Sequence, residues 1–310
     1  MVFIAIQRIR REDRESWLAL RKRYIGGSDA ASIVGLNDYQ SPYALWCEKR
    51  GITPEFEGNL RTEVGAYLED FIAKRFEQET GKRVQRSNFS FVNESYPWAI
   101  ADVDREIVGE NAGLECKSTS ALNLKHYKNG DYPARFYVQC VHYMAVKGYE
   151  RMYLAVLIGN SDFKIFVIDR DEAEIEALMD AEKDFYGYMT SGEEPPVIPQ
   201  DAESVELAHP VSNGASIELF GQQNIIREYL ELKERIAALE KEADGIAATL
   251  KQDMGDAEKG TDGEYIVTWA NRERRTFDKK AFQKDNPSID LSKWEKVSTY
   301  RAFSVKQITA

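Results

Sequence analysis

The sequence predicts an α+β fold in which a central mixed β-sheet is flanked by helices. Short apolar runs bounded by turn residues crowd into residues 89–168, and helical periodicities precede and follow them. The chain has 310 residues, 43% hydrophobic and 30% charged, so it can bury a full core as one large domain or two smaller ones. We expect a core at residues 1–199, a linker at 200–215, and an appendage with a helical arm and small β pieces at 216–310.

The first forty residues are expected to form short helices around a glycine pair. A helix over residues 12–23 stops before the pair at 26–27, and Ser28 or Asp29 can cap the next helix. A helix start with open amides, a hydroxyl and Arg21 nearby is a candidate phosphate site. A capped helix–turn–helix with a surface arginine explains the same residues, and it is the simpler interpretation of them alone.

A helix that begins at Ser41 and the clearest helix of the chain, residues 59–80, follow. Glu69 borders the apolar stripe of the second helix. A carboxylate there is costly unless it is paired or bound to a metal, but an edge position that reaches solvent fits equally well. The stripe consists of Leu60, Val64, Leu68, Phe71, Ile72 and Phe76.

Residues 99–119 are expected to form two strands joined by a polar turn. Glu115 and Lys117 alternate on the second strand and therefore face one side, and Asp104 lies near the first strand. Two carboxylates and an ammonium group there could hold a divalent cation and position a water. D-x10-E-x-K is the spacing of the PD-(D/E)xK nuclease motif, although a solvated hairpin with a surface ion pair accounts for the stretch equally well.

Beyond this stretch, a helix from residue 133 to about 146 is expected to carry Gln139 on one face with Arg135 and His142. A long helix over 217–254 has its apolar residues on one side, which is typical of a coiled-coil-like hairpin or arm. The other expected elements are a hairpin at 152–168, an acidic helix at 171–190, and tail strands at 264–269 and 300–305 around a short helix near Asp278.

Charge and cysteine usage narrow the class of protein. The net charge is −11, yet residues 1–25 hold seven basic and three acidic residues, and residues 271–310 hold ten and five. Any nucleic-acid affinity must then come from a local patch or an enclosed channel. Three scattered cysteines argue against a disulfide framework, a zinc ribbon and an iron–sulfur cluster. They predict a reducing, cytoplasmic setting, and no apolar run approaches the length of a membrane helix.

Five stretches fit one family in order and spacing. They are WLALRKRYIGGSDAASIVG with SPYALWCEKRG, GAYLED, the D-x10-ECK core, YVQCVHYMAV, and the tail VTWANRERRTFD…KVSTYRAFSVK. They resemble the YqaJ-like viral recombinase family, relatives of the phage lambda exonuclease within the PD-(D/E)xK superfamily. Order and spacing fit over about residues 14–170, the tail resembles that of many family members, and the combination is more specific than any one stretch. The resemblance implies a nuclease core of that superfamily.

The resemblance also implies roles for single residues. Glu69, Asp104 and Glu115 would be metal ligands, with the Cys116 carbonyl as a further one. Lys117 would orient or polarise the attacking water.

Other roles follow from neighbouring motifs. Gln139 would sit behind the site and help to fix the lysine, the water or the scissile phosphate. Arg21 and Ser28, seven residues apart, match the positions that hold the 5′ phosphate in lambda-type enzymes, and Arg23 is an alternative in that segment.

Two positions depart from the family pattern. Val103 replaces the motif proline before the aspartate, and Arg105 stands where glycine is common. Asp102 is a second candidate for the catalytic aspartate. Asp104 is preferred because its distance to Glu115 fits better, and Asp102 shares a strand face with it and could assist.

These residues imply a chemistry and a set of partners. Oxygen ligands suit Mg²⁺ or Mn²⁺ rather than zinc. The resemblance implies a deoxyribonuclease that digests double-stranded DNA ends in the 5′-to-3′ direction and leaves 3′ single strands for phage-type recombination. A single-strand annealing protein, a homo-oligomer that could be ring-shaped, and a phage or prophage origin are expected with it. Two alternatives remain, namely a nicking or structure-specific endonuclease of the same superfamily and a nonenzymatic DNA-end scaffold of an annealing complex.

Overall fold

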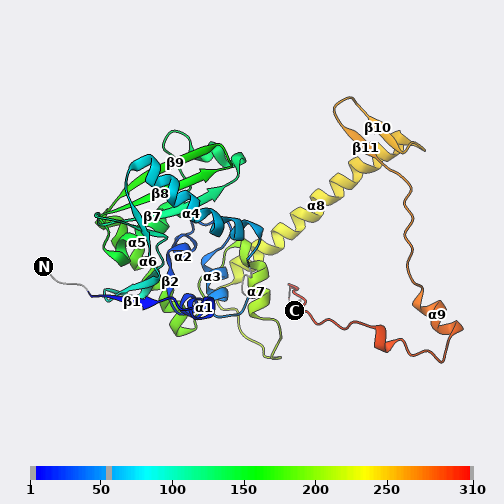
Figure 1. Ribbon diagram of the computed structural model, residues 1–310. Coiled ribbons are helices and arrows are strands. Elements are labelled where there is room, and N and C mark those ends of the chain that lie inside the picture. Colours follow the sequence, from blue (N-terminus) through cyan, green and yellow to red (C-terminus); the bar gives the residue numbers. More distant parts are fainter. Residues whose placement is uncertain (1–4, 54–57, 308–310) are drawn as a thin grey trace. The chain divides into compact units, whose positions relative to one another are not determined.

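The computed structural model describes residues 5–53 and 58–307 and divides the chain into two units, Met1–His209 and Pro210–Ala310 (Figure 1). The boundary falls inside the stretch expected to be a linker. Part of that stretch, however, is helix α7 (Ala202–Ala208), which packs against helix α3 (Pro42–Lys49). Val205 and Ala208 contact the apolar cluster around α3, so the first unit extends past the expected end of the core.

A five-stranded mixed sheet with the order β3-β6-β7-β8-β9 forms the centre of the first unit. Strands β7 and β8 are parallel, and helix α5 makes the crossover between them, whereas the other neighbouring strands are antiparallel. The bounds are Val84–Arg86 (β3), Arg105–Ile107 (β6), Ala112–Thr119 (β7), Ala134–Lys147 (α5), Arg151–Ile158 (β8) and Asp162–Asp169 (β9).

A second sheet of four strands has the order β1-β4-β5-β2. Residues 102–104 connect its strand β5 to β6 of the larger sheet, so the two sheets adjoin at the predicted aspartate. Strand β2 pairs in parallel with β5, which places Gly26, the first residue of the glycine pair, beside Ile100. The bounds are Ile6–Arg10 (β1), Ile25–Gly26 (β2), Phe89–Asn93 (β4) and Tyr96–Ala101 (β5).

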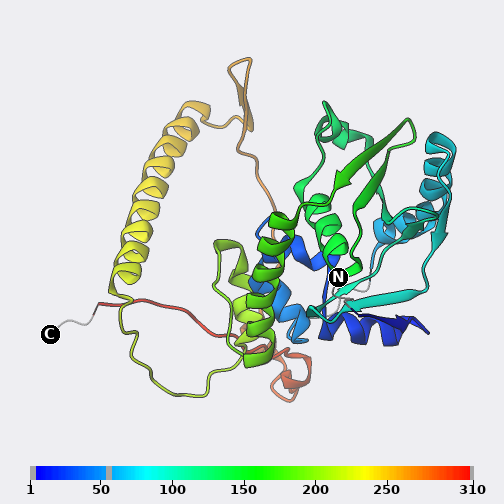
Figure 2. The same ribbon diagram turned by 90° about the vertical axis from the view of Figure 1, so that its left-hand side faces the viewer.

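Helix α4 (Leu60–Thr80) and helix α5 lie on opposite sides of the larger sheet (Figure 2). Successive side chains of a strand point to opposite faces, so β8 contributes to both layers. Tyr153 and Ala155 of β8 pack in the cluster of α4, and Met152, Leu154 and Val156 pack in the cluster of α5. The other α-helices among the described residues of the first unit are α1 (Arg14–Arg23), α2 (Gly27–Ile33) and α6 (Glu172–Ser191).

The predicted fold class, α+β with a mixed sheet flanked by helices, is confirmed, but several elements differ from expectation. Residues 99–119 span the end of β5 and all of β6 and β7, so Asp104 lies in the connection just before β6. Of the apolar stripe of α4, Leu68, Ile72 and Phe76 pack against the sheet, whereas Leu60, Val64 and Phe71 are exposed. Leu60 is 73% exposed and Ile72 1%, because the cluster beneath the helix begins at Leu68.

The start of α2 also differs. Gly26, rather than Ser28 or Asp29, occupies the N-cap position. Asp29 lies in the first turn, and its carboxylate accepts a hydrogen bond from the Gly26 amide at 2.8 Å.

The second unit contains helix α8 (Gln223–Met254), a hairpin of β10 (Lys259–Thr261) and β11 (Ile266–Thr268), and helix α9 (Lys279–Asp285). Helix α8 starts six residues later than expected, because a turn with Gly221 at φ 79° interrupts the chain before it. The strand expected at 300–305 is absent there, since these described residues have no hydrogen-bonded strand partner. No helix within the described residues combines the length and apolarity needed to span a membrane.

Candidate active site

Strand β7 presents Glu115 and Lys117 to the same face of the sheet, toward helix α5. Glu115 is buried, with 2% of its surface exposed, although it is a carboxylate. The Lys117 ammonium lies 2.5 Å from Glu115 Oε1, and the Gln139 amide donates to the same oxygen at 2.8 Å. Three of the predicted site residues therefore meet around one carboxylate oxygen.

The other oxygen of Glu115, Oε2, is buried and has no hydrogen-bond partner among the described residues. Burial raises the pKa of Glu115, and the charge of Lys117 opposes that rise. An unsatisfied buried carboxylate oxygen is costly in a folded protein unless something else binds it.

Asp104 lies beside this carboxylate. Its Oδ2 accepts a hydrogen bond from the Cys116 amide at 2.8 Å. Burial, followed by the charge of Glu115, raises the pKa of Asp104 well above its usual range. The Cys116 side chain packs toward helix α4, so only its backbone could contribute to a site on the Glu115 face.

Lys117 is the cation nearest to these carboxylates. Its ammonium group also lies 5.2 Å from the centre of the Phe136 ring. Burial acts to lower the pKa of Lys117, but the charges of Glu115 and Asp104 outweigh it and raise that pKa. The lysine is thus held as a cation that can donate hydrogen bonds to a water or a phosphate oxygen.

Glu69 approaches from helix α4 but is engaged elsewhere. Its Oε1 forms an ion pair with Arg105, and Arg86 lies 3.8 Å from the same oxygen. Arg105 also pairs with Asp70. Across residues 5–53 and 58–307, no three His, Cys, Asp or Glu side chains lie close enough together to form a metal-binding group.

The residues nonetheless suit a hard divalent cation. Asp104 and Glu115 supply oxygen donors, one of them a buried oxygen without a partner. Glu69 adds negative charge that helps to raise the pKa values of both carboxyls. A cation would relieve this repulsion, and oxygen-only donors are those that Mg²⁺ or Mn²⁺ binds.

Tyr143 and Gly27 were not predicted as site residues, yet they form the support of Gln139. The Gln139 amide donates to the Tyr143 hydroxyl at 2.9 Å. A Cβ atom on Gly27 would lie 2.6 Å from Tyr143 Cε1 and 3.2 Å from Gln139 Cγ. The spacing of Gln139 and Tyr143, four residues apart on a helix, was the available signal.

Asp102, the reserve candidate for the aspartate, has other partners. Its Oδ2 accepts from the Trp17 indole at 2.8 Å, and its Oδ1 accepts from the Ser90 hydroxyl. Arg11 lies 3.8 Å away. Asp102 therefore ties helix α1 to strand β4, while Asp104 faces Glu115.

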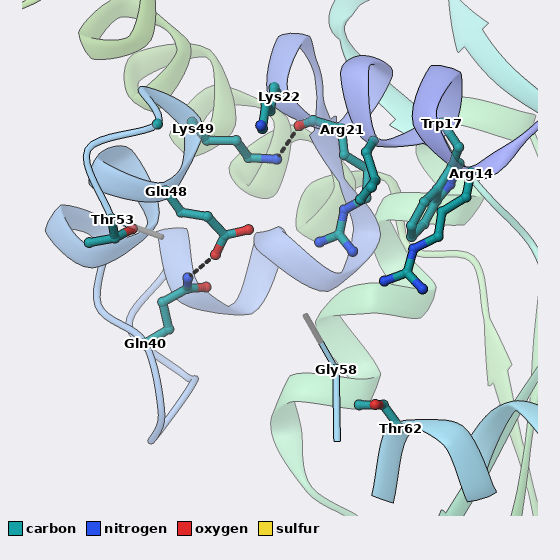
Figure 3. Close-up of a pocket in the computed structure, with 12 residues that line it drawn as sticks. Arg14, Trp17, Arg21, Lys22, Gln40, Glu48, Lys49, Thr53, Gly58 and Thr62 are labelled. Atoms are coloured by element: carbon teal, nitrogen blue, oxygen red, sulfur yellow. Dashed lines mark hydrogen bonds between the residues drawn. The ribbon is translucent and has the colours of Figure 1, made fainter. Parts of the chain in front are cut away.

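A pocket of about 720 Å³ lies beside helix α1 (Figure 3). Arg14, Trp17 and Arg21 follow one another along one face of α1 and line it, with Thr62 on the opposite side. Sequence reasoning identified Arg21 here but missed Arg14 and Trp17, although their spacing on the expected helix was visible.

The structure brings Arg21 and Ser28 together. Arg21 Nη2 donates to Ser28 Oγ at 3.2 Å, and the guanidinium lies 5.2 Å from the centre of the Trp17 ring. Arg23, the alternative, instead lies over the Tyr24 ring.

Asp29 and Lys49 form a buried ion pair next to Arg21. Lys49 Nζ lies 2.5 Å from Asp29 Oδ2 and also donates to the Arg21 and Tyr24 carbonyls. Burial acts to raise the pKa of Asp29, but the charges of Lys49 and Arg21 outweigh it and lower that pKa. The pair fixes the end of helix α1 against helix α3.

Comparison with known proteins places this chain in a family. The model of the YqaJ-like viral recombinase domain matches residues 16–150. The YqaJ protein of Bacillus subtilis (strain 168) is 35% identical over 304 residues, which cover 96% of this chain and 95% of that protein. Protein D345L of African swine fever virus is 44% identical over 46 residues, which cover 15% of this chain and 12% of that protein.

Two solved structures are also similar to this chain. One is an alkaline exonuclease (LHK-Exo) from Laribacter hongkongensis, with 18% identity, a TM-score of 0.49, and coverage of 58% of this chain and 94% of that one. The other is a phage related exonuclease from Haemophilus somnus 129PT, with 14% identity, a TM-score of 0.43, and coverage of 55% and 96%. Because the Bacillus subtilis relative matches along nearly its whole length, the chain belongs to the YqaJ-like viral recombinase family.

Proposed function

We propose that this chain is a metal-dependent DNA exonuclease that hydrolyses double-stranded DNA from its ends, in the 5′-to-3′ direction. The observation that carries the proposal is the buried Glu115 carboxylate. Lys117 and Gln139 bind one of its oxygens, and the other has no partner among the described residues. Such a carboxylate beside Asp104 suits a site that binds a further group, because one of its oxygens is buried without a hydrogen-bond partner.

Asp104, Glu115 and the Cys116 carbonyl would hold a Mg²⁺ or Mn²⁺ ion, and Glu69 would join them after exchanging its ion pair with Arg105. A bound ion of this kind lowers the pKa of a water and neutralises charge on the scissile phosphate. The Lys117 ammonium donates to the attacking water and holds it against phosphorus. Gln139 keeps the Glu115 carboxylate in place while the reaction proceeds.

The reaction is hydrolysis of a phosphodiester. The water oxygen forms a bond to phosphorus as the bond from phosphorus to the 3′ oxygen breaks. The attacking water gives up one proton to solvent, the 3′ oxygen takes up one proton from solvent, and the products are a 5′ phosphate and a 3′ hydroxyl.

The pocket beside α1 supports the end-directed part of the proposal. Arg14 and Arg21 line it and supply positive charge, and Ser28, which accepts a hydrogen bond from Arg21, supplies a hydroxyl next to that arginine. These groups together suit a terminal 5′ phosphate. The family resemblance supports a single-strand annealing protein as a partner and a homo-oligomer, ring-shaped as in lambda-type enzymes.

A nuclease assay with three substrates tests this function. With Mg²⁺ or Mn²⁺, we expect nucleotide release from a 5′-phosphorylated linear duplex, slower release from its 5′-hydroxyl counterpart, and none from a covalently closed circle. Cleavage of the circle would instead indicate the endonuclease alternative. Lys117→Ala should reduce release by at least about 100-fold, in line with the loss of a group that stabilises the transition state.

The matched control is Lys74→Ala, which removes an exposed lysine of helix α4. It should leave the rate unchanged. If the parent protein binds DNA ends but releases no nucleotides with either metal, the chain is a nonenzymatic scaffold and the proposal fails.

A further inference from the structure

Helix α8 carries an apolar stripe with a strict heptad spacing. From Ile225 to Leu250 the steps between stripe residues alternate between four and three. Ile225 is 63% exposed, Leu239 61% and Ile246 59%, so solvent reaches residues along the whole length of the stripe. The stripe consists of Ile225, Tyr229, Leu232, Ile236, Leu239, Ala243, Ile246 and Leu250.

The period of this stripe indicates the kind of partner. A straight helix drifts by about 20° per heptad against a strict seven-residue repeat, so a stripe meant for a flat protein surface would not keep it. A strict repeat over more than three heptads is typical of a helix that supercoils around another helix. The partner must then carry a matching stripe.

Among the described helices, only α8 offers such a stripe. Helix α6 buries its main apolar residues, among them Ile175, in the first unit. Helix α4 exposes Leu60, Val64, Tyr67 and Phe71 at the same spacing, but over fewer than two heptads. A second copy of α8 is therefore the matching partner. Its central layers place Ile236 at an a position between Leu232 and Leu239 at d positions, a combination that favours two strands when the helices are parallel.

The charges beside the stripe suit self-association. In a parallel pair, Glu228 of one helix faces Lys233 of the other, and Arg235 faces Glu240. In an antiparallel pair, Arg235 faces Glu242 and Lys233 faces Glu240. Opposite charges face each other in both the parallel and the antiparallel pair, so the charged residues beside the stripe stabilise pairing of two α8 helices.

We infer that helix α8 is a self-association arm that forms a two-stranded coiled coil with α8 of a second copy of this chain. The stripe is the interface, and residues Lys233 and Arg235 contribute its flanking ion pairs. This association does not depend on the nuclease activity or on contacts between the first units.

Light scattering of the full-length chain tests the inference. Leu232→Glu/Leu239→Glu puts charge into the stripe and should lower the molar mass at least twofold. The matched control, Ala238→Glu/Ala248→Glu, places the same charges at exposed positions outside the stripe and should keep the parent mass. A parent chain that is monomeric at tens of micromolar, or an equal mass for the parent and the stripe variant, would overturn the inference.

A second variant leaves the stripe intact. Lys233→Glu/Arg235→Glu opposes like charges in both directions of pairing and should raise the dissociation constant at least tenfold in low salt. Because the Debye length falls to about 3 Å at 1 M salt, most of this loss should disappear there. If neither this variant nor the stripe variant alters association, α8 does not pair with a second copy.

Discussion

At the scale of single residues, the candidate site depends on how Gln139 is held against Glu115. The Gln139 amide lies 2.8 Å from Glu115 Oε1 and 2.9 Å from the Tyr143 hydroxyl. Tyr143→Phe keeps the ring and removes one of these two acceptors. We expect kcat on a 5′-phosphorylated duplex to fall about 2- to 10-fold, the equivalent of one hydrogen bond of ~0.5–1.5 kcal/mol. KM should change little and the free energy of unfolding should fall by about 0.5–1.5 kcal/mol, and an unchanged kcat would show that Tyr143 does not position Gln139.

Gly27 packs against the ring of Tyr143, so a substitution there also disturbs the support of Gln139. Tyr143 is 4% exposed and cannot swing away from a Cβ atom 2.6 Å from its ring. Gly27→Ala should therefore lower the free energy of unfolding by about 1–3 kcal/mol, the usual cost of overpacking. The comparison is Gly187→Ala in helix α6, where a Cβ meets open space. That variant should gain about 0.5–1 kcal/mol, as alanine does in a helix. Urea unfolding measures both, and equal signs would contradict the packing argument.

Some of these residues could be predicted from the sequence and others could not. Glu115 and Lys117 follow from strand alternation, which is a local rule. Arg105 pairs with Glu69 through the packing of helix α4 beside strand β6, and no local pattern contains that contact. The same holds for Lys49, whose buried ion pair with Asp29 joins residues twenty positions apart.

At the scale of elements, a buried titratable pair joins helices α5 and α6. His142 Nδ1 lies 2.7 Å from Glu182 Oε1, and His142 Nε2 lies 2.9 Å from the Ile100 carbonyl oxygen. Burial acts to lower the pKa of His142, but Glu182 outweighs it and raises that pKa above 6.5. Burial raises the pKa of Glu182 above 4.5. Asp29 and Lys49 are the other charged groups that act on the pair.

Both shifts have the same consequence for stability. A group whose pKa is raised in the folded state binds protons on folding. Its contribution to the free energy of unfolding is complete below its pKa in the unfolded chain and is lost as the pH rises through its pKa in the folded protein. We expect the free energy of unfolding in urea to fall as pH rises from 6 to 9. Glu182→Gln removes the carboxylate charge that raises the pKa of His142, so burial leaves that pKa lowered. Stability should then rise with pH between 5 and 7, and a profile parallel to that of the parent would rule out this linkage.

Prediction of the elements succeeded where periodicity coincided with burial. Helix α5 and the hairpin of β8 and β9 fall where the pattern predicts them. The first half of α4 shows the failure, because its apolar spacing continues beyond the cluster that begins at Leu68. Strand β6 has three residues, too few for any periodicity to predict it.

At the scale of the whole molecule, charge is divided unevenly between the two units. Residues 1–209 contain 25 basic and 35 acidic residues, whereas residues 210–310 contain 16 and 17. A first unit with this excess of acid repels a DNA backbone on average. The proposed binding of DNA must then depend on few cations, and Arg14 and Arg21, which line the pocket beside α1, are two candidates.

A site with few cations predicts that DNA affinity falls only slowly with rising salt, and that removing a single arginine changes this slope measurably. Each phosphate contact adds about one to the slope of log affinity against log salt. In a Lys117→Ala background, which spares the DNA, Arg14→Ala should weaken binding of a 5′-phosphorylated duplex and lower that slope by about one. Arg21→Ala should do the same and also abolish the preference over a 5′-hydroxyl end. Arg75→Ala, which removes an arginine paired with Glu79 on α4, should change neither quantity. If it reduces the slope as much as Arg14→Ala does, DNA binding is spread over the surface rather than concentrated in the pocket.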